Sequence, residues 1–567
     1  MILQLRFSLL SIALLFCFSA GAQLSGNYTI NSAQATGGTN FQTFNDFATD
    51  INTNGITADV IVTVAPGSGP YNEQVTFANI SGAGPTSTVT IEGNGETIRA
   101  AADSANRHVI RLTDIQYFTV NNLRIERDSA STTTGFYAVH IYNTGNNITI
   151  SNCSVYIYGT TSTLAGGYIA SGSMTSILAG GDFSDIFIVS DTSTGGGYGA
   201  SVFGLASPLA ENISISECTF YDFHSNGVYL RETDGAVVKG CHFDKRTSNV
   251  TSANAIQVAQ NANINTVIHH NFIKVSQQSN GTVTFRGIYL FNGTGHQVFN
   301  NVIHDVNLTS GNFTGIEVRT AGTAPEIYFN TIAIDDTAAT TGNLYGIKEE
   351  LSNTGSILRN NIVSISQPTS GNKAALVLGA ISTVTTALNS NYNLLWAPGG
   401  NIALKNPISP TFYPTLNNWQ AASTQDSVSL NLDPVFISAT LSQPTNLAAD
   451  NAGTPIAWIT TDIVGSPRGP TPDVGAYEFP SNVGVEPVKF NAEQLCYPNP
   501  FSDQLNVKVS SSLSSEIILF NAIGGIIFRK QFAGSISVNT GKLPAGIYFY
   551  ELRSDNTGSA RGKLIKQ

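Results

Sequence analysis

Charged residues are scarce in this sequence: Asp, Glu, Lys and Arg together make up 11% of its 567 residues. Gly, Asn, Thr and Ser are abundant instead, so the composition is poor in helix formers and rich in β-branched and turn residues. It predicts an all-β chain with many corners. A hydrophobic content of 41% excludes a disordered chain. The formal net charge of −11 argues against nucleic acid or an anionic membrane as the partner.

Long apolar runs are also few. The run from Phe7 to Phe18 follows Arg6 and precedes the small residues Ser19–Ala22. It is too short to span a bilayer, and this order of segments is typical of a secretory signal peptide. Residues 1–22 are therefore predicted to be a signal peptide that takes the chain out of the cytoplasm. No later segment is long and apolar enough to indicate a membrane span.

Cysteine is rare in the chain that remains. Once Cys17 is removed with the signal peptide, Cys153, Cys218, Cys241 and Cys496 are left. Four cysteines are too few for a disulfide framework in a chain of this length. We expect free, buried thiols.

Motifs of several common enzyme classes are missing. The sequence has no His-Glu-x-x-His zinc site, no phosphate-binding Walker loop and no Gly-x-Ser-x-Gly nucleophile elbow. These absences argue against a zinc protease, a P-loop nucleotidase and a serine hydrolase of the α/β type. We expect no metal site and no cofactor.

An internal repeat of about thirty residues is the main positive signal. Gly240, His270, Asn300, Asn330 and Asn360 fall in one column, each thirty residues from the last. Asn tolerates the left-handed conformation of a tight corner, and stacked Asn amides can form a ladder of hydrogen bonds. The column therefore predicts a structural corner rather than a binding site.

A second column contains a small residue followed by an apolar, a variable and an apolar residue. It includes Gly227-Val-Tyr-Leu230, Gly287-Ile-Tyr-Leu290, Gly315-Ile-Glu-Val318 and Gly346-Ile-Lys-Glu349. This alternation predicts a short strand with one buried face in each repeat. Successive repeats would stack as parallel coils about 4.8 Å apart. A solenoid of this kind escapes the size limit of a single core because each repeat is buried only against its neighbours.

Motifs at the two ends of the repeat region identify a family. Apolar residues with helical spacing lie between Phe41 and Ile51, and the segments Thr461–Arg468 and Asp473–Phe479 have the pattern of a closing motif of bacterial surface β-helices. Residues 56–480 thus resemble the right-handed parallel β-helix superfamily of pectate-lyase-like proteins. The resemblance implies a right-handed solenoid and, within residues 23–55, a helix that covers the open N-terminal end.

The last seventy residues have a different pattern. Cys496-Tyr-Pro-Asn-Pro-Phe501, Leu543-Pro-Ala-Gly-Ile-Tyr-Phe549 and short alternating strands predict a small β-sandwich at 495–567, after a linker at 481–494. This segment resembles the C-terminal sorting domain of the type IX secretion system of Bacteroidota. The resemblance implies recognition by that machinery and a location outside the cell or on its outer surface, reached through the periplasm.

Variable positions of the second column point away from the coil interior and supply the candidate site. Aromatic rings flanked by charges suit sugars, so the predicted substrate-binding residues are Tyr229, Arg231, Tyr289, Glu317, Arg319 and Lys348. The plainer alternative is a solvated strand face with Glu317–Lys348 and Arg319–Glu350 ion pairs, which contribute about 0–1 kcal/mol each.

Two functions remain open. The first is a non-catalytic, monomeric surface protein that binds polysaccharide or adheres, and the missing catalytic motifs favour it; the paired aspartates of polygalacturonases are also absent. The second is a polysaccharide lyase acting on an acidic polymer. Resemblance to β-helix lyases would then make Lys348 the base and Arg319 the group that meets carboxylate charge, with Glu317 and Glu350 as candidate calcium ligands.

Overall fold

The computed structural model describes two separate units, residues 1–479 and 480–567. The described residues are 22–247, 252–259, 263–275, 283–319, 324–351, 355–379, 388–438, 441–479, 495–508, 514–522, 525–554 and 558–567. The predicted signal peptide, apart from Ala22, and the predicted linker at 481–494 lie outside them.

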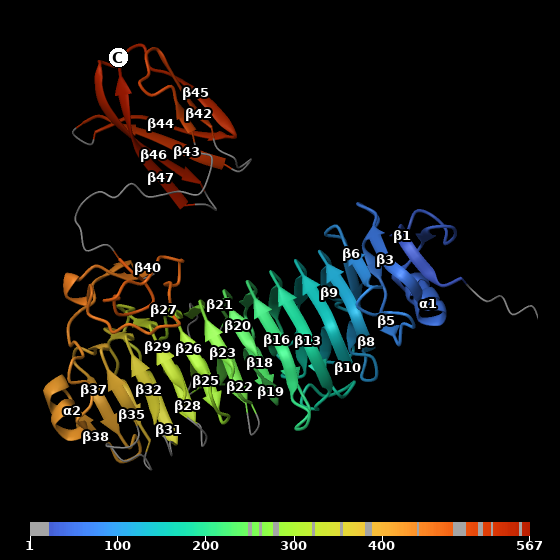
Figure 1. Ribbon diagram of the computed structural model, residues 1–567, viewed down its shortest axis with the longest axis horizontal. Coiled ribbons are helices and arrows are strands. Elements are labelled where there is room, and N and C mark those ends of the chain that lie inside the picture. The colour runs from blue at the N-terminus through green and yellow to red at the C-terminus, as the bar shows by residue number, and fades with distance from the viewer. Residues whose placement is uncertain are drawn as a thin grey trace, which may run out of the picture. The chain divides into compact units, whose positions relative to one another are not determined.

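Each coil of the first unit contributes strands to three parallel sheets, which confirms the predicted parallel β-helix. We number these sheets 1, 2 and 3. Two long strands, β8 (His108–Asn121) and β10 (Phe136–Ser151), run from sheet 1 into sheet 2 and connect the two. Strands of successive coils lie side by side along the long axis of this unit (Figure 1).

Sheet 1 consists of β5 (Val75–Ala78), the first halves of β8 (His108–Asn121) and β10 (Phe136–Ser151), β12 (Ala165–Ser171), β15 (Tyr198–Phe203), β18 (Asn226–Arg231), β22 (Ala253–Ala259), β25 (Thr284–Phe291), β28 (Asn312–Arg319), β31 (Leu344–Leu351), β34 (Lys373–Leu378), β37 (Asn401–Lys405) and the antiparallel β38 (Thr411–Tyr413). Sheet 2 consists of β1 (Leu24–Ile30), β2 (Asn40–Phe41), β3 (Ile56–Val64), β6 (Val89–Glu92), the second halves of β8 and β10, β13 (Asp182–Val189), β16 (Ala210–Ser216), β19 (Thr233–Asp234), β20 (Val237–Lys239), β23 (Val267–His269), β26 (Gln297–Phe299), β29 (Glu326–Tyr328), β32 (Ser356–Arg359) and β35 (Leu388–Asn391). Sheet 3 consists of β4 (Tyr71–Asn72), β7 (Thr97–Ala100), β9 (Arg124–Arg127), β11 (Ser154–Ile157), β14 (Thr192–Gly195), β17 (Thr219–Tyr221), β21 (His242–Lys245), β24 (Phe272–Val275), β27 (Val302–Val306), β30 (Thr331–Ile334), β33 (Ile362–Ile365) and β36 (Leu394–Trp396).

A buried amide ladder holds the corner between sheets 2 and 3. It consists of Asn271, Asn301, Asn330, Asn361 and Asn393. Each of the first four side chains donates from Nδ2 to Oδ1 of the next, at 2.9–3.0 Å. The same Oδ1 accepts the backbone N–H of the preceding Asn, so buried donors and acceptors satisfy one another from coil to coil.

The three core cysteines continue this column toward the N-terminus. The backbone N–H of Cys241 donates to Oδ1 of Asn271 at 3.0 Å, and that of Cys153 donates to the carboxylate of the buried Asp191 at 2.6 Å. Cys153, Cys218 and Cys241 are buried and free, as expected from the sequence, and Cys496 is free and half-buried.

One residue of the predicted corner column was assigned wrongly. The left-handed residue just before the ladder is Gly240, His270, Asn300, Phe329 or Asn360 in successive coils, with φ between 50° and 64°. Asn330 lies one position later, in the buried ladder. The reason is the coil length: ladder residues are 30, 29, 31 and 32 residues apart, so counting by thirty places Asn330 in the wrong column. Both the turn and the amide ladder were also predicted for the corner column, whereas the structure places the turn in that column and the ladder in the adjacent one.

Helices cover both ends of the β-helix (Figure 1). At the N-terminal end, α1 (Phe44–Asn54) occupies the place where the apolar spacing predicted a helix. Thr43 is its N-cap and accepts the Asp46 N–H at 3.0 Å, and the Phe47 ring packs against Phe77 with centroids 5.7 Å apart. At the other end, α2 (Leu416–Ser423) buries Trp419 beside Tyr413. Each helix shields strand edges that would otherwise be open for pairing.

The second unit has two antiparallel sheets around its own core. One contains β41 (Leu495–Tyr497), β42 (Gln504–Lys508) and β45 (Ser535–Asn539), and the other contains β44 (Ile526–Ala533), β43 (Ser514–Phe520), β46 (Gly546–Ser554) and β47 (Gly558–Lys566). Both sheets contribute to one buried cluster that includes Leu505, Val538, Leu519 and Leu564. This arrangement confirms the predicted small β-sandwich.

The amide ladder predicts a large stability loss from a small substitution. In Asn330→Ala, the backbone N–H of Asn301 loses its buried acceptor, which costs about 1–3 kcal/mol, whereas Oδ1 of Asn361 keeps the backbone N–H of residue 330. We expect the midpoint of urea unfolding to fall clearly for Asn330→Ala and to stay within error for Asn27→Ala, an exposed Asn of β1. Equal effects of the two substitutions would contradict this role of the ladder.

Candidate functional site

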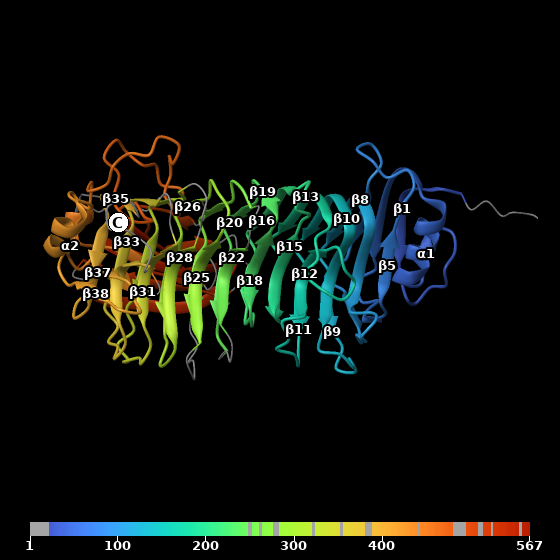
Figure 2. The ribbon, with the colours of Figure 1, turned by 90° about the horizontal axis from the view of Figure 1, so that it is seen from below.

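The residues that the sequence singled out lie in rows on the outer face of sheet 1. Tyr229, Gln257, Tyr289, Glu317 and Lys348 pair directly, one from each successive coil. Their strands, from β18 to β31, lie side by side in Figure 2. A second row runs through Arg231, Ala259, Phe291 and Arg319.

Ion pairs connect the charged members of these rows. Oε2 of Glu317 lies 2.8 Å from Nε of Arg286 and 3.6 Å from Nζ of Lys348. Glu350 lies 2.5 Å from Lys348 and 3.5 Å from Arg319. Both ion pairs that the sequence suggested as the plainer alternative are therefore present, and Arg286 adds a third contact.

Most of this face is covered, although the sequence analysis expected it to face solvent. Tyr229 is 7%, Tyr289 8% and Glu317 1% exposed. Tyr229 packs with Tyr198 and Ile177, and the guanidinium of Arg286 lies 4.6 Å from the centre of the Tyr289 ring. Long side chains on coils only about 4.8 Å apart cover one another, which the pattern of one strand does not reveal. Burial also raises the pKa values of Tyr229 and Tyr289.

The same contacts bear on the candidate lyase and calcium chemistry. The amino group of Lys348, the candidate base, is already engaged by two carboxylates, at 3.6 Å from Glu317 and 2.5 Å from Glu350. The position between Glu317 and Glu350 is likewise taken by the Lys348 amino group. Among the described residues, no group of three or more His, Cys, Asp or Glu side chains is arranged to hold a metal.

The outer face of sheet 3 offers an open surface that sequence reasoning missed. One outward column runs through Thr219, His242 and Phe272, and the next through Tyr221, Asp244, Lys274 and His304. A pocket of about 390 Å³ lies at these columns. Its lining consists of Thr219, Tyr221, His242, Phe243, Asp244, Phe272, Lys274 and His304.

Aromatic side chains form much of the pocket. The rings of His242 and Phe272 stack with centroids 5.0 Å apart and planes 7° apart, and the His304 ring stands edge-on to Phe272. Arg246 covers one side of the Tyr221 ring at 4.1 Å. Between these apolar surfaces lie a hydroxyl from Thr219, a carboxylate from Asp244 and an ammonium from Lys274. Partial desolvation of the His242 ring by its neighbours lowers its pKa from the ordinary value.

A closing segment, residues 446–479, covers the rest of sheet 3. Beyond Phe272 the first outward column continues through Val302, Thr331, Ile362 and Leu394, all fully buried. Val302 packs against Ile463, Ala476 and Tyr477 of the closing segment, and Phe272 lies at the margin of this cluster. The pocket therefore lies where the open part of sheet 3 meets the covered part.

The corner column anchors the closing segment. Asn300 donates to the Thr461 carbonyl and Asn360 to the Thr454 carbonyl, both at 2.8 Å, and the His270 Nε2 lies 3.0 Å from the Asp462 carbonyl oxygen. These corner side chains thus have a second role besides turning the backbone. This role could not be inferred from the sequence, because the partners are more than ninety residues away along the chain.

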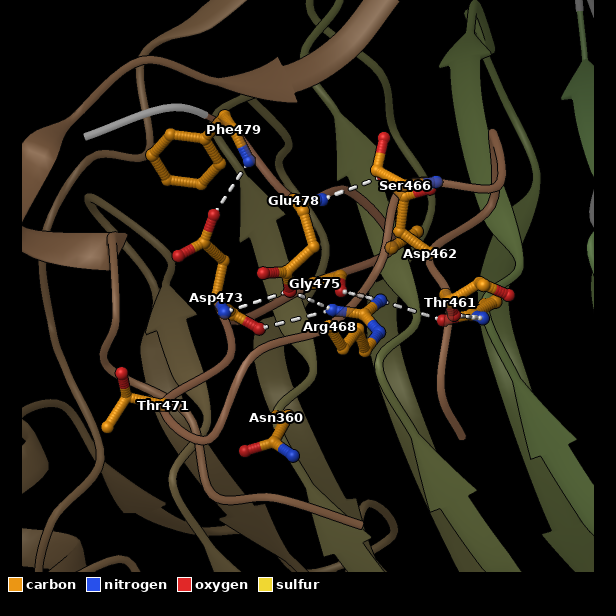
Figure 3. Close-up of polar contacts among 12 residues, drawn as sticks. Asn360, Thr461, Asp462, Ser466, Arg468, Thr471, Asp473, Gly475, Glu478 and Phe479 are labelled. Carbon is orange, nitrogen blue, oxygen red and sulfur yellow. Dashed lines mark hydrogen bonds and ion pairs between the residues drawn. The ribbon is translucent and has the colours of Figure 1, made fainter. Parts of the chain in front are cut away.

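Arg468 is the centre of the polar contacts of the closing segment (Figure 3). Its side chain is 2% exposed and lies 2.5 Å from Oε1 of Glu478. It also donates to Oδ1 of Asn300 at 2.8 Å and to the Gly475 carbonyl at 3.0 Å, and its guanidinium lies 3.8 Å from the centre of the Phe329 ring. The two halves of the closing motif, Thr461–Arg468 and Asp473–Phe479, are joined through this residue.

The carboxyl groups of the closing segment predict a pH-dependent stability. Burial raises the pKa of Asp473 to about 7 and also raises that of Glu478, whereas an unfolded Asp titrates near 3.8. The folded protein therefore holds more protons than the unfolded chain from about pH 4 to about pH 7. This stabilising contribution is complete below pH 3.8 and is lost as the pH rises through 7.

Burial lowers the pKa values of His140 and His296, which contribute to the pH dependence with the opposite sign, so the test is the difference between variants in the slope of the urea midpoint against pH. As the pH rises through this window, we expect the urea midpoint to change more favourably in Asp473→Asn than in the unaltered protein. Asp182→Asn, at an exposed position, should leave the slope unchanged. An unchanged slope in Asp473→Asn would contradict the assignment.

Comparison with known proteins assigns the second unit. Residues 495–567 match the family of secretion system C-terminal sorting domains. No curated protein matches the chain in sequence. Among the described residues, no helix is long and apolar enough to cross a membrane.

Several solved structures are similar to the chain. The GH136 lacto-N-biosidase from Eubacterium ramulus is 10% identical over 63% of this chain and 68% of its own, with a TM-score of 0.37. PfbA, a surface adhesin of Streptococcus pneumoniae, is 13% identical over 61% of this chain and 82% of its own, with a TM-score of 0.37. Pectate lyase Pel9A is 13% identical over 81% of this chain and 98% of its own, with a TM-score of 0.34. At such low sequence identities and TM-scores, these similarities do not assign an activity to the chain.

The second unit determines the destination of the protein. Its two-sheet core, its Pro498-Asn-Pro-Phe501 opening and the family match agree. The sorting domain is recognised by the secretion machinery and marks the chain for the cell surface or the extracellular space. Residues 495–567 therefore belong to the type IX secretion system C-terminal sorting domains, and the chain that they export is a parallel β-helix.

Proposed function

We propose that this protein is a non-catalytic glycan-binding protein of the outer cell surface or the extracellular space. The pocket on the open part of sheet 3 carries the proposal. Its volume of about 390 Å³ lies in the range of small-ligand sites, which are mostly apolar with a few fixed polar groups. We further propose that a signal peptide directs the chain to the periplasm and that the protein acts as a monomer.

The chemistry of the pocket supports a sugar as the ligand. A sugar ring has apolar C–H surfaces and a rim of hydroxyls, each of which can donate and accept hydrogen bonds. The rings of Tyr221, His242 and Phe272 offer apolar contact, while Thr219 and Asp244 offer hydrogen-bond partners. Because the strands are held in register by neighbouring coils, these groups are positioned before a ligand arrives, which reduces the entropy cost of binding.

Substitutions on the two faces distinguish the pocket from the sheet 1 rows. Tyr221→Ala and His242→Ala should each weaken binding by about tenfold, the equivalent of about 1.4 kcal/mol. Phe291→Ala, in a sheet 1 row, is the matched control and should leave affinity unchanged. The measurement is affinity electrophoresis or calorimetry of the mature chain against neutral and acidic polysaccharides. Loss of binding in Phe291→Ala but not in the pocket variants would place the site on sheet 1.

A polysaccharide lyase is the second candidate, because Arg319 and Lys348 lie on adjacent coils. Glu350 pairs with both of these cations and Glu317 pairs with Lys348, which weighs against a lyase. We expect no unsaturated product by ultraviolet absorbance from any uronate polymer, with or without calcium. Product formation that is lost in Lys348→Ala would overturn the non-catalytic proposal.

A further inference from the structure

We infer that the glycan bound in the sheet 3 pocket is uncharged. The inference rests on the proposed function and adds the class of ligand. It follows from the way in which the cations of this face are paired.

The cation in the pocket already has an anionic partner. Nζ of Lys274 lies 2.5 Å from a carboxylate oxygen of Asp305, and this hydrogen bond raises the pKa of Lys274. A glycan carboxylate or sulfate would have to displace Asp305 or share the lysine with it. Either arrangement loses much of the charge-assisted hydrogen bond that makes anion recognition favourable.

Three other cations on the open part of sheet 3 are paired with carboxylates as well. Within the described residues, Arg246 lies 2.8 Å from Asp222 and Arg124 lies 2.5 Å from Glu126. Arg99 is 3.9 Å from Asp128. Arg127 of β9 instead donates to the backbone carbonyls of Tyr158 and Thr133, both at 2.9 Å. These cations therefore have bound partners, and they form no row of uncompensated positive charge for a polyanion.

The remaining charge of the pocket is negative. Apart from the histidines His242 and His304, the charged groups are Lys274, Asp244 and the adjacent Asp305, a balance of minus one. The whole chain carries a net charge of −11, so the long-range field also repels anions. Hydroxyl groups, in contrast, can use the Thr219 hydroxyl and the Asp244 carboxylate without a charge conflict.

Pairs of polymers that differ only in charge test the inference. The probes are methyl-esterified and de-esterified galacturonan, cellulose and carboxymethyl cellulose, and xylan with and without glucuronic acid branches. We expect the mature chain to bind the neutral member of at least one pair about tenfold or more tightly than the acidic member. Affinity for the neutral member should stay constant between about 0.1 M and about 1 M salt, where charge pairs are progressively screened.

Asp305→Asn provides a test of the mechanism. Asp305 has a left-handed φ of 50°, which Asn tolerates, so the variant should fold. It frees Lys274 and should raise affinity for the acidic members, in a salt-sensitive way, while leaving affinity for the neutral member within about twofold. Asp182→Asn, away from the pocket, is the matched control for the loss of one negative charge.

The possible results separate the two proposals. Tighter, salt-sensitive binding of the acidic members by the unaltered chain overturns the neutral-ligand inference and leaves the glycan-binding function standing. Binding of no polymer in the panel overturns both. An Asp305→Asn variant that folds, as judged by circular dichroism, and gains no affinity for acidic polymers overturns the role given to the Lys274–Asp305 pair.

Discussion

Parallel hydrogen bonding between successive coils is the interaction on which the rest of this structure depends. Each strand of the β-helix is paired by the coils before and after it, at a spacing of about 4.8 Å. A residue at one position of the repeat therefore meets its copies on both sides. Inside the coil this contact forms the apolar core and the Asn ladder; outside, it arranges unrelated side chains in straight columns.

Stacking also creates the problem that the closing segment and the two helices address. The two ends of the stack would expose unpaired strands, and α1 and α2 cover them. The closing segment instead binds along the side, where the corner residues Asn300 and Asn360 present amides at a fixed spacing. By covering the later coils of sheet 3, it confines the open surface to the earlier ones. The candidate pocket lies at that boundary because Phe272 is the last residue of its column that remains partly open.

The sequence predicted the architecture well because the information is local and repeated. A small residue followed by apolar alternation recurs in coil after coil, so strand direction, parallel stacking and the free core thiols could be inferred. Asn330 was assigned to the wrong column because the coils around it have 29 and 31 residues, so a constant period of thirty shifts the register by one residue. The hydrogen bonds of the structure distinguish the column that turns the backbone from the column that stacks. For the site, adjacency of Glu317 and Lys348 was predictable, whereas their burial depends on neighbours from other coils. The pocket was not predictable, because its lining comes from four successive coils and because the closing segment, which buries the later part of the same column, lies far along the chain.

The central claim is that the outer face of sheet 3, rather than that of sheet 1, binds the ligand. Hydrogen exchange of the mature chain, measured with and without a saturating neutral oligosaccharide that it binds, tests this claim directly. The account predicts ligand-dependent protection confined to β17, β21, β24 and β27, whose residues line the pocket. Protection confined to β25, β28 and β31 of sheet 1 would contradict it and would place the ligand on the rows that contain Tyr289, Glu317 and Lys348.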